Sequence, residues 1–262
     1  MHDILDLKTF PLDQPDTPAY ADLVADCKND LARNGMFNLT GFLKPDVAQQ
    51  IAKGLEPTFA SDAFTHSRQH NIYFRKDVPD VAVDHPALRQ FETINHTLCA
   101  DQIEGNQILD VYRFAPLANF LARVMEKPKL FTMDDPLACT NLMAYHEGEA
   151  LNWHFDRSEF TTTLLLQAPE AGCEFEYRSD LRTDSDPNYD GVANLLAGQD
   201  MDVRSLTLSA GTLNVFRGKN TAHRITPVQG QTTRIIAVFS YYETPGVVFS
   251  DEDRIGFFGR AS

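Results

Sequence analysis

Residues 152–156 read NWHFD and carry two side-chain types that bind metal ions. If this stretch is a β-strand, side chains two residues apart share a face, so His154 and Asp156 project together while Trp153 points the other way into a core. An imidazole and a carboxylate on one patch can hold a divalent cation. A histidine and an aspartate at this spacing also occur by chance on protein surfaces, so the pair needs further ligands nearby.

A second segment supplies one more histidine and an arginine. His223 lies near the end of a strand-like stretch, residues 226–230 (TPVQG) are typical of a turn, and Arg234 begins a return strand. Adjacent strands of this kind can direct His223 and Arg234 into one cavity. Two histidines and a carboxylate leave coordination positions open, which suits non-haem Fe(II), and an arginine fork suits a planar carboxylate. The alternative is a core histidine and a surface ion pair.

The elements that must position these residues divide the chain into two parts. The first part has apolar residues at helical spacing, with Thr17 and Gly35 as the expected limits of the first helix and a short strand at 36–43. We predict helices over 17–35, 44–57, 85–103 and 115–127.

After about residue 129 the sequence changes to short runs rich in Thr, Val, Phe, Tyr and Leu. We predict strands over 129–133, 139–146, 151–156, 160–167, 173–178, 203–208, 212–218, 222–228 and 233–243. Helices followed by strands indicate an α+β fold in which helices brace an antiparallel double sheet. We expect one domain, 1–262, with a helical part at 1–128 and a β-rich core at 129–250. The polar segment 179–202 is expected to be either a lid or a solvated insertion with a short helix.

Composition narrows the possible partners. The 262 residues include 23 Lys and Arg against 37 Asp and Glu, a net charge of −14, which would repel nucleic acid. The four cysteines form no C-x-x-C pair, and there is neither a signal-peptide pattern nor an apolar run long enough for a membrane helix. We therefore expect a cytoplasmic protein that acts on a small molecule, without nucleic-acid or membrane partners; no pattern predicts its oligomeric state.

Two stretches, 152–177 and 221–260, resemble the Fe(II)- and 2-oxoglutarate-dependent oxygenases. The similarity is greatest to the small free-standing amino-acid hydroxylases and their radical-halogenase relatives, and it extends over roughly residues 70–260. The resemblance implies that His154, Asp156 and His223 bind the iron and that Arg234 anchors 2-oxoglutarate. It also implies a double-stranded β-helix, the jelly-roll form of the double sheet.

The same resemblance bears on the reaction. Halogenating relatives have glycine at the carboxylate position, where chloride then binds, whereas this chain has Asp156. The implied activity is therefore hydroxylation of a C–H bond, with Fe(II), 2-oxoglutarate and O2, in a free amino acid or a derivative of one. Three alternatives remain open. They are an oxygenase that desaturates, epimerises or cyclises its substrate, an oxygenase acting on a macromolecule, and a non-catalytic jelly-roll protein with a structural metal ion.

Further residues are candidates for binding the two organic molecules. Asn141 and Tyr145 can share a strand face, where they would either contact the cosubstrate or be ordinary sheet residues. Arg75 lies in a segment that resembles one feeding the site in relatives, where it would take a substrate carboxylate; the alternative is one charge of an exposed run, residues 75–77 (RKD). Arg157 follows the proposed iron ligands and is expected either at the substrate or in an ion pair at the rim.

The resemblance also bears on lysine as a substrate. Lysine-acting relatives place polar and acidic groups where this chain has Leu151, Val238 and Phe258. This difference argues against lysine, and we expect Phe258 to contact the substrate.

Overall fold

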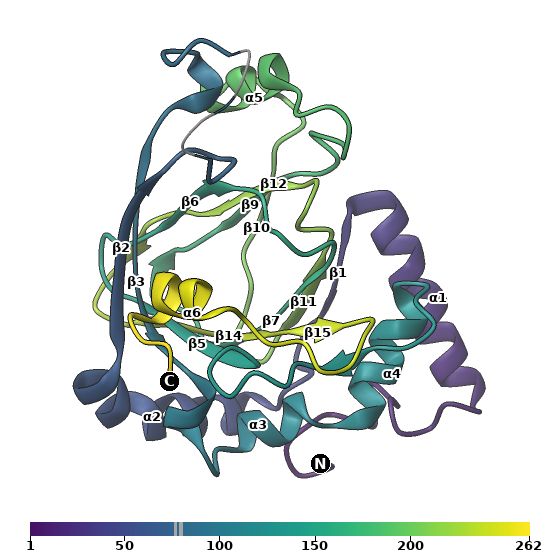
Figure 1. Ribbon diagram of the computed structural model, residues 1–262. Helices are drawn as coiled ribbons and strands as arrows, with labels where there is room; N and C mark the ends of the chain where they lie inside the picture. The colour runs from purple at the N-terminus through teal and green to yellow at the C-terminus, as the bar shows by residue number, and fades with distance from the viewer. Residues whose placement is uncertain (76–77, 79–80) are drawn as a thin grey trace.

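The computed structural model describes residues 1–75, 78 and 81–262. It combines short helices with many strands (Figure 1). The helices are α1 (Pro18–Asn34), α2 (Pro45–Asp62), α3 (Gln107–Tyr112), α4 (Ala115–Val124), α5 (Tyr189–Leu196) and α6 (Asp251–Phe258), with 3-10 turns η1 (Pro86–Leu88) and η2 (Ala100–Ile103). The strands are β1 (Met36–Leu39), β2 (Phe64–His70), β3 (Phe91–Leu98), β4 (Phe131–Thr132), β5 (Thr140–Tyr145), β6 (Leu151–His154), β7 (Thr161–Gln167), β8 (Ala171–Gly172), β9 (Phe175–Arg178), β10 (Arg204–Leu206), β11 (Leu213–Phe216), β12 (Ala222–Ile225), β13 (Val228–Gln229), β14 (Arg234–Phe239) and β15 (Tyr241–Tyr242).

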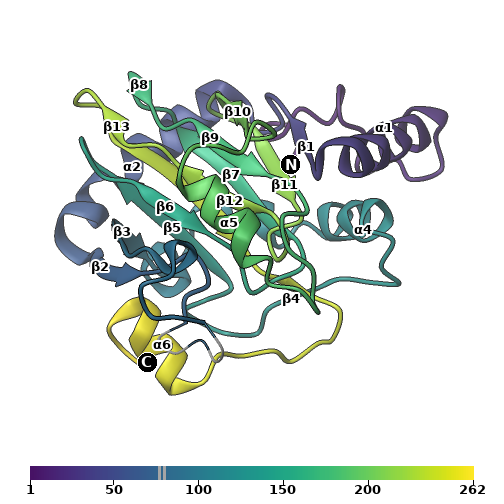
Figure 2. The same cartoon turned by 90° about the horizontal axis from the view of Figure 1, so that it is seen from above.

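Two antiparallel sheets enclose the middle of the molecule. The larger has seven strands in the order β1-β11-β7-β14-β5-β3-β2, and the smaller has four in the order β10-β9-β12-β6. Figures 1 and 2 show the smaller sheet lying across the larger one. The α+β class and the predicted strands after residue 129 are confirmed, apart from short shifts at their ends and a break within 233–243 between β14 and β15.

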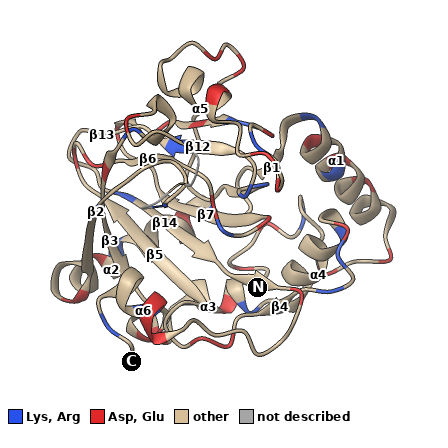
Figure 3. Cartoon of the chain, turned by 45° about the horizontal axis from the view of Figure 1, so that its top comes forward, with Lys and Arg blue, Asp and Glu red and all other residues tan. Residues whose placement is uncertain are grey.

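The central strand β14 shows how the larger sheet separates a cavity from a core. It pairs with β5 on one side and β7 on the other. Ile235 and Ala237 belong to the main hydrophobic core, which the helices cover, whereas Ile236 and Val238 line the cavity between the sheets. This alternation follows from the two-residue period of a strand. Figure 3 shows few charged residues on β5, β7 and β14, in contrast to the acidic residues on α5 and α6.

The helices before residue 63 follow their predicted starts. The hydroxyl of Thr17 accepts a hydrogen bond from the Tyr20 N–H at the start of α1, and Gly35 ends that helix in the left-handed conformation, φ 74°. Helix α2 was predicted to end at Pro57 but continues to Asp62. Proline inside a helix removes one backbone donor and crowds the preceding turn, but it does not end this helix, and the additional turn packs Phe59 against the core.

The predicted helix over residues 85–103 is wrong. This segment contains strand β3, which lies between β2 and β5 in the larger sheet, with a 3-10 turn at each end. Its apolar residues are compatible with a helical spacing, but pairing with two distant strands decides the structure. Since β2 was not predicted either, the part before residue 128 is not simply helical.

The segment 179–202 covers the outer face of the smaller sheet. Val192 and Leu195 of α5 are buried in a cluster with Trp153 and Phe155, the two residues predicted to point away from the metal ligands. The short helix expected within this segment is present as α5, whose inner face is packed, while residues 183–186 and 197–199 are exposed to solvent. None of the segment's described residues lines the cavity between the sheets. Among the residues that the structure describes, no helix has the length and apolar character needed to cross a bilayer.

Candidate metal and cosubstrate site

Strand β6, the residues directly after it, and strand β12 bring together three side chains that could hold a metal ion. His154 and His223 are directly paired across these strands, and their ring centroids lie 4.0 Å apart. Asp156 follows β6 and donates its backbone N–H to the carbonyl of Gly218 at 3.0 Å. The Asp156 carboxylate oxygens lie 3.4 Å from Nε2 of each histidine. One ligand atom from each of the three residues therefore falls within 4.8 Å of the others, which is compact enough for one ion.

The hydrogen bonds of the two histidines leave their inner nitrogens available. Nδ1 of His154 lies 2.8 Å from the carbonyl of Asn152, and Nδ1 of His223 lies 3.0 Å from the carbonyl of Thr221. A carbonyl can only accept, so each Nδ1 carries the proton and donates it, and Nε2 keeps its lone pair. Both free Nε2 atoms face Asp156.

The protonation of the site also suits a cation. Burial, reinforced by the neighbouring His154, lowers the pKa of His223 to about 4, so this ring is neutral near pH 7. Burial alone would raise the pKa of Asp156, but the two histidines and the hydroxyl of Thr161 outweigh burial, and the pKa stays well below its usual value. The neutral His223 ring and the anionic Asp156 carboxylate therefore suit a bound cation.

Two residues that support Asp156 were missed in the sequence. The Thr161 hydroxyl donates a hydrogen bond to Oδ2 of Asp156. A Cβ atom placed on Gly218 would lie 2.3 Å from the same oxygen, so only glycine leaves room for the carboxylate. Neither residue belongs to a recognisable motif, although the short spacing from Asp156 to Thr161 allows a contact across a turn.

Arg234 lines the same cavity as His154, Asp156 and His223 and has no acidic partner among the described residues. It starts β14 opposite Tyr145, is 3% exposed, and holds its guanidinium 5.5 Å from the centre of the Tyr145 ring. Burial lowers the pKa of Arg234, but a guanidinium remains protonated at neutral pH. Among the residues that the structure describes, no Asp or Glu lies within ion-pair distance of it. A buried arginine of this kind is suited to a carboxylate brought by a small molecule.

A cavity of about 300 Å³ joins these groups between the two sheets. Besides the three metal-binding residues and Arg234, its walls are mostly apolar or neutral. The lining includes Arg68, Phe74, Thr93, Asn95, Thr97, Asn141, Met143, Tyr145, Leu151, Thr161, Thr163, Ile225, Ile236, Val238, Phe249, Phe257 and Phe258. Its volume is at the lower end for small-molecule sites.

The sequence matches one protein family over most of its length. Residues 20–247 match the family described as Halogenase D. The chain belongs to this family. No curated protein matches it.

Several solved structures of 2-oxoglutarate oxygenases share the fold of this chain. A 2OG-Fe(II) oxygenase family oxidoreductase from Burkholderia pseudomallei is 14% identical, with a TM-score of 0.51 over 86% of this chain and 92% of the other. AviO1 from Streptomyces viridochromogenes Tue57 is 17% identical, with a TM-score of 0.55 over 83% and 93% of the chains. HygX from Streptomyces hygroscopicus, solved with nickel and 2-oxoglutarate, is 10% identical, with a TM-score of 0.55 over 82% and 85%. At these identities the likeness concerns the fold, which is that of the 2-oxoglutarate and Fe(II) oxygenases.

The other predicted residues differ in their distance from the cavity. Tyr145 and Asn141 both face it from β5, but the Asn141 amide already donates to the Leu137 carbonyl at 2.9 Å. Arg75 is exposed and is not among the described residues that line the cavity, and its backbone N–H and C=O are hydrogen-bonded to the Asn71 side chain.

Arg157 lies at the rim and not inside the cavity of this Halogenase D family member. Its side chain is 73% exposed, its guanidinium lies 2.7 Å from the Asp253 carboxylate, and it covers the Phe257 ring at 5.2 Å. It follows the strand end and points off the face that carries His154 and Asp156, which is one of the two positions expected from the sequence. The predicted substrate residue Phe258 lines the cavity from α6.

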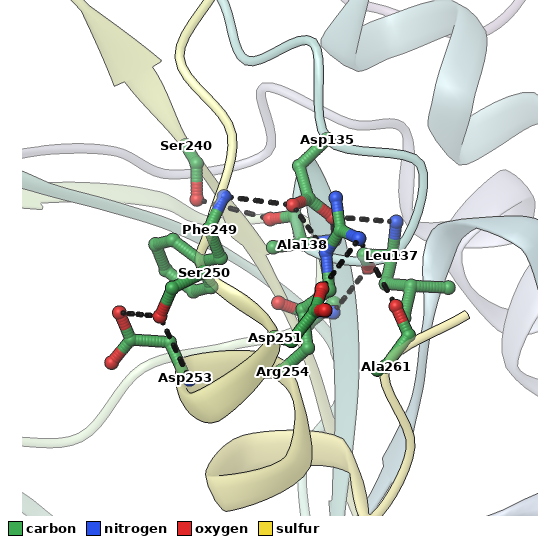
Figure 4. Close-up of polar contacts among 11 residues, drawn as sticks. Asp135, Leu137, Ala138, Ser240, Phe249, Ser250, Asp251, Asp253, Arg254 and Ala261 are labelled. Atoms are coloured by element: carbon green, nitrogen blue, oxygen red, sulfur yellow. Dashed lines mark hydrogen bonds and ion pairs between the residues drawn. The ribbon is translucent and has the colours of Figure 1, made fainter.

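One buried carboxylate holds the C-terminal wall of the cavity in place. Asp135 is 1% exposed and accepts hydrogen bonds from the backbone N–H groups of Leu137, Ala138 and Phe249 and from Nε of Arg254. Figure 4 shows these donors converging on Asp135 from α6, from the segment just before it, and from the turn before β5. Phe249 and, on α6, Phe257 and Phe258 line the cavity. By binding both segments, Asp135 fixes the position of this aromatic wall.

Proposed function

We propose that this protein is an Fe(II)- and 2-oxoglutarate-dependent oxygenase that hydroxylates a C–H bond of a small substrate, a free amino acid or a derivative. The observation that carries the proposal is the pairing of His154 with His223 beside Asp156, with both Nε2 atoms free and the buried Arg234 close by. Metal-binding residues next to an arginine without a carboxylate partner suit an ion and a keto acid bound together.

The residues fit this metal and this cosubstrate by their chemistry. His154, Asp156 and His223 would hold the ion, and bound Fe(II), together with 2-oxoglutarate and O2, would supply the oxidising power that a C–H bond requires. The backbone carbonyls of Asn152 and Thr221 keep the two rings in the ligating tautomer. Arg234 would anchor the far carboxylate of the keto acid, and the apolar walls would orient the substrate and exclude water.

Asp156 favours hydroxylation over the halogenation that the family description names. Its carboxylate lies between the two histidines and is held by Thr161. Relatives that halogenate have glycine at this position, which leaves a place for halide at the metal. An anionic side chain in that position disfavours halide binding.

Two measurements test the proposal on the full-length protein. Anaerobic calorimetry with Mn(II) should show binding of 2-oxoglutarate, and His154→Ala or His223→Ala should abolish it. With Fe(II), O2 and a panel of amino acids and small amines, a substrate should stimulate release of succinate and gain the mass of one oxygen, even with chloride present. The surface variant His2→Ala serves as a matched histidine control.

Three outcomes would contradict the proposal in different ways. A chlorinated product would refute the assignment of Asp156. A product that has lost two hydrogens, or that differs from the substrate only in configuration, would support the assigned cofactors but refute hydroxylation. Tight zinc binding without any uptake of 2-oxoglutarate would indicate a structural metal site, which would leave buried Arg234 without a function.

A further inference from the structure

The cavity contains a second arginine, Arg68, that has no carboxylate partner among the described residues. Arg68 lies on β2, where every second side chain turns inward, and it lines the cavity together with His66. Its Nε is buried and has no hydrogen-bond partner. Within residues 1–75, 78 and 81–262, no carboxylate lies within 4.0 Å of its guanidinium.

Several other partly buried arginines do have such partners, whereas Arg182 and Arg217 have none among the described residues. Arg254 pairs with Asp135, Arg224 with Glu176, and Arg178 with Asp200 and Asp202. Among the described residues that line the cavity, Arg68 and Arg234 are the only arginines and there is no lysine. Neither arginine has a carboxylate partner among the described residues. A half-buried cation without a counter-ion is costly unless a ligand supplies one.

Aromatic stacking holds Arg68 beside the metal-binding residues. The guanidinium lies 4.1 Å from the centre of the Phe74 ring, and that ring lies 5.6 Å from the ring of His154. Phe74 has φ 53°, a conformation that is strained for a residue with a large side chain. The backbone strain is thus associated with placing an aromatic ring between an arginine and a metal-binding histidine.

Arg68 and Arg234 are positioned for two separate anions. Their strands, β2 and β14, are separated by β3 and β5 in the larger sheet. Three steps between neighbouring strands correspond to about 14 Å. Arg234 is opposite Tyr145 in β5, whereas Arg68 is next to Phe74 and His154. If Arg234 takes 2-oxoglutarate, Arg68 remains for the substrate.

The remaining cavity wall indicates what the rest of the substrate is like. Phe249, Phe257 and Phe258 close one end, and Val238 and Leu151 add aliphatic surface. Neutral polar groups come from several strands of the larger sheet, β3, β5, β7 and β11. Asp156, which the proposed function assigns to the metal, is the only acidic side chain among the described lining residues. A substrate with a cationic side chain would find no carboxylate there.

We propose that Arg68 is the substrate-binding residue for a carboxylate, and that the substrate is a small carboxylic acid with an uncharged, largely apolar body, such as a neutral amino acid. This inference rests on the proposed function of the same site. It replaces Arg75 and Arg157, the two arginines expected from the sequence to meet the substrate, with Arg68.

The test compares acids with their amides in the full-length enzyme supplied with Fe(II), 2-oxoglutarate and O2. The probes are leucine, phenylalanine, the carboxamides of both, 4-methylpentanoic acid, which lacks the amino group of leucine, and lysine. Succinate release gives KM and kcat for each. Wild-type enzyme should prefer an acid to its amide by about 100-fold in kcat/KM, because a charge-assisted bidentate pair is lost in the amide. 4-Methylpentanoic acid shows whether the amino group is needed, and lysine should be a poor substrate.

Variants assign that preference to one side chain. Arg68→Gln should raise KM for the acid about 100-fold and bring acid and amide to similar values, while calorimetric binding of 2-oxoglutarate with Mn(II) stays unchanged. Arg33→Gln, an exposed arginine on α1, should behave like the wild type. Arg75→Gln tests the rival position in the same assay.

The inference is overturned if the preference for acids persists in Arg68→Gln, if Arg75→Gln removes it instead, or if lysine is preferred to leucine. It is also overturned if no carboxylic acid of the panel binds. In each of these cases 2-oxoglutarate can still bind with Mn(II), so the proposed function survives. Loss of that binding in the wild-type protein is a separate result, which would refute the proposed function itself.

Discussion

Thr161 supports the metal site through a single hydrogen bond. Its hydroxyl donates to Oδ2 of Asp156, which fixes the carboxylate between the two histidines. Replacing Thr161 by Val keeps the shape of the side chain but removes the donor. We expect Thr161→Val to weaken Mn(II) binding about 10-fold, the lower range for groups that orient a metal ligand. Calorimetry measures this change.

Thr161→Ser is the matched control, because it keeps the hydroxyl and should bind Mn(II) nearly as the wild type does. Equal affinity of the Val variant and the wild type would show that Thr161 does not orient Asp156.

Gly218 makes room for the same carboxylate. A Cβ at this position would lie 2.3 Å from Oδ2 of Asp156 and 2.5 Å from Oγ1 of Thr161, which no side chain tolerates without movement. We expect Gly218→Ala to displace Asp156 and to reduce Mn(II) binding by more than about 10-fold while the fold persists. Gly54→Ala is the control, because a Cβ there meets nothing within 4 Å. Unchanged metal affinity in Gly218→Ala would contradict the crowding argument.

At the scale of elements, Asp135 links the turn before β5 to helix α6. Asparagine at this position has the same shape, but its amide nitrogen cannot accept from the donors of Phe249 and Arg254 (Figure 4). Because one partner of a buried ion pair is removed, we expect Asp135→Asn to lower the free energy of unfolding by about 3 kcal/mol. Urea denaturation monitored by circular dichroism measures this loss. Asp134→Asn, an exposed neighbour, should change it little.

The double variant Asp135→Asn/Arg254→Met separates the pair from the backbone contacts. If the pair dominates, the double variant should be no less stable than Asp135→Asn alone. Additive losses would assign most of the stabilisation to the backbone donors of Leu137, Ala138 and Phe249.

The Asp135 carboxylate makes the free energy of unfolding depend on pH in the acidic range. Burial alone would raise the pKa of Asp135, but its backbone hydrogen bonds and Arg254 outweigh burial and hold the pKa below its usual value of 3.8. Since the pKa is depressed in the folded state, the stabilisation is complete above about pH 4 and is lost as the pH falls through the folded-state pKa. The stability difference between wild type and Asp135→Asn should therefore shrink below about pH 4 in urea titrations. A difference that stays constant on acidification would exclude an ionised Asp135 as its source.

At the scale of the whole molecule, the site joins the two sheets. His154 and His223 come from the smaller sheet, whereas Arg234 and Tyr145 come from the larger one. Ligands that contact both sheets should therefore stabilise the entire fold. With Mn(II) and 2-oxoglutarate each at 100 times Kd, we expect the pair to add at least about 2.7 kcal/mol, seen as a rise in Tm by differential scanning calorimetry.

His154→Ala should remove that rise without lowering the Tm of the metal-free protein by a similar amount. A rise with Mn(II) alone that 2-oxoglutarate does not extend would indicate that the keto acid does not bridge the sheets.

Local sequence patterns determined the parts of the protein that depend on short-range rules. The two-residue period placed His154 and Asp156 together and Trp153 on the opposite face, and the caps at Thr17 and Gly35 marked helix α1. The strands after residue 129 could be predicted for the same reason, because alternation and turn residues are local signals.

Tertiary structure decided what depends on contacts between distant segments. Strand β3 is a strand because β2 and β5 flank it, although its apolar spacing also fits a helix. The positions of Gly218 against Asp156, of Asp135 under α6 and of Arg68 beside Phe74 follow from chain packing that no short motif encodes. The residue types of the candidate metal site, two histidines and an aspartate, could be recognised in the sequence, because the ability to bind a metal ion is a property of each side chain. The residues around them could not be predicted, because proximity and burial arise only when the chain folds.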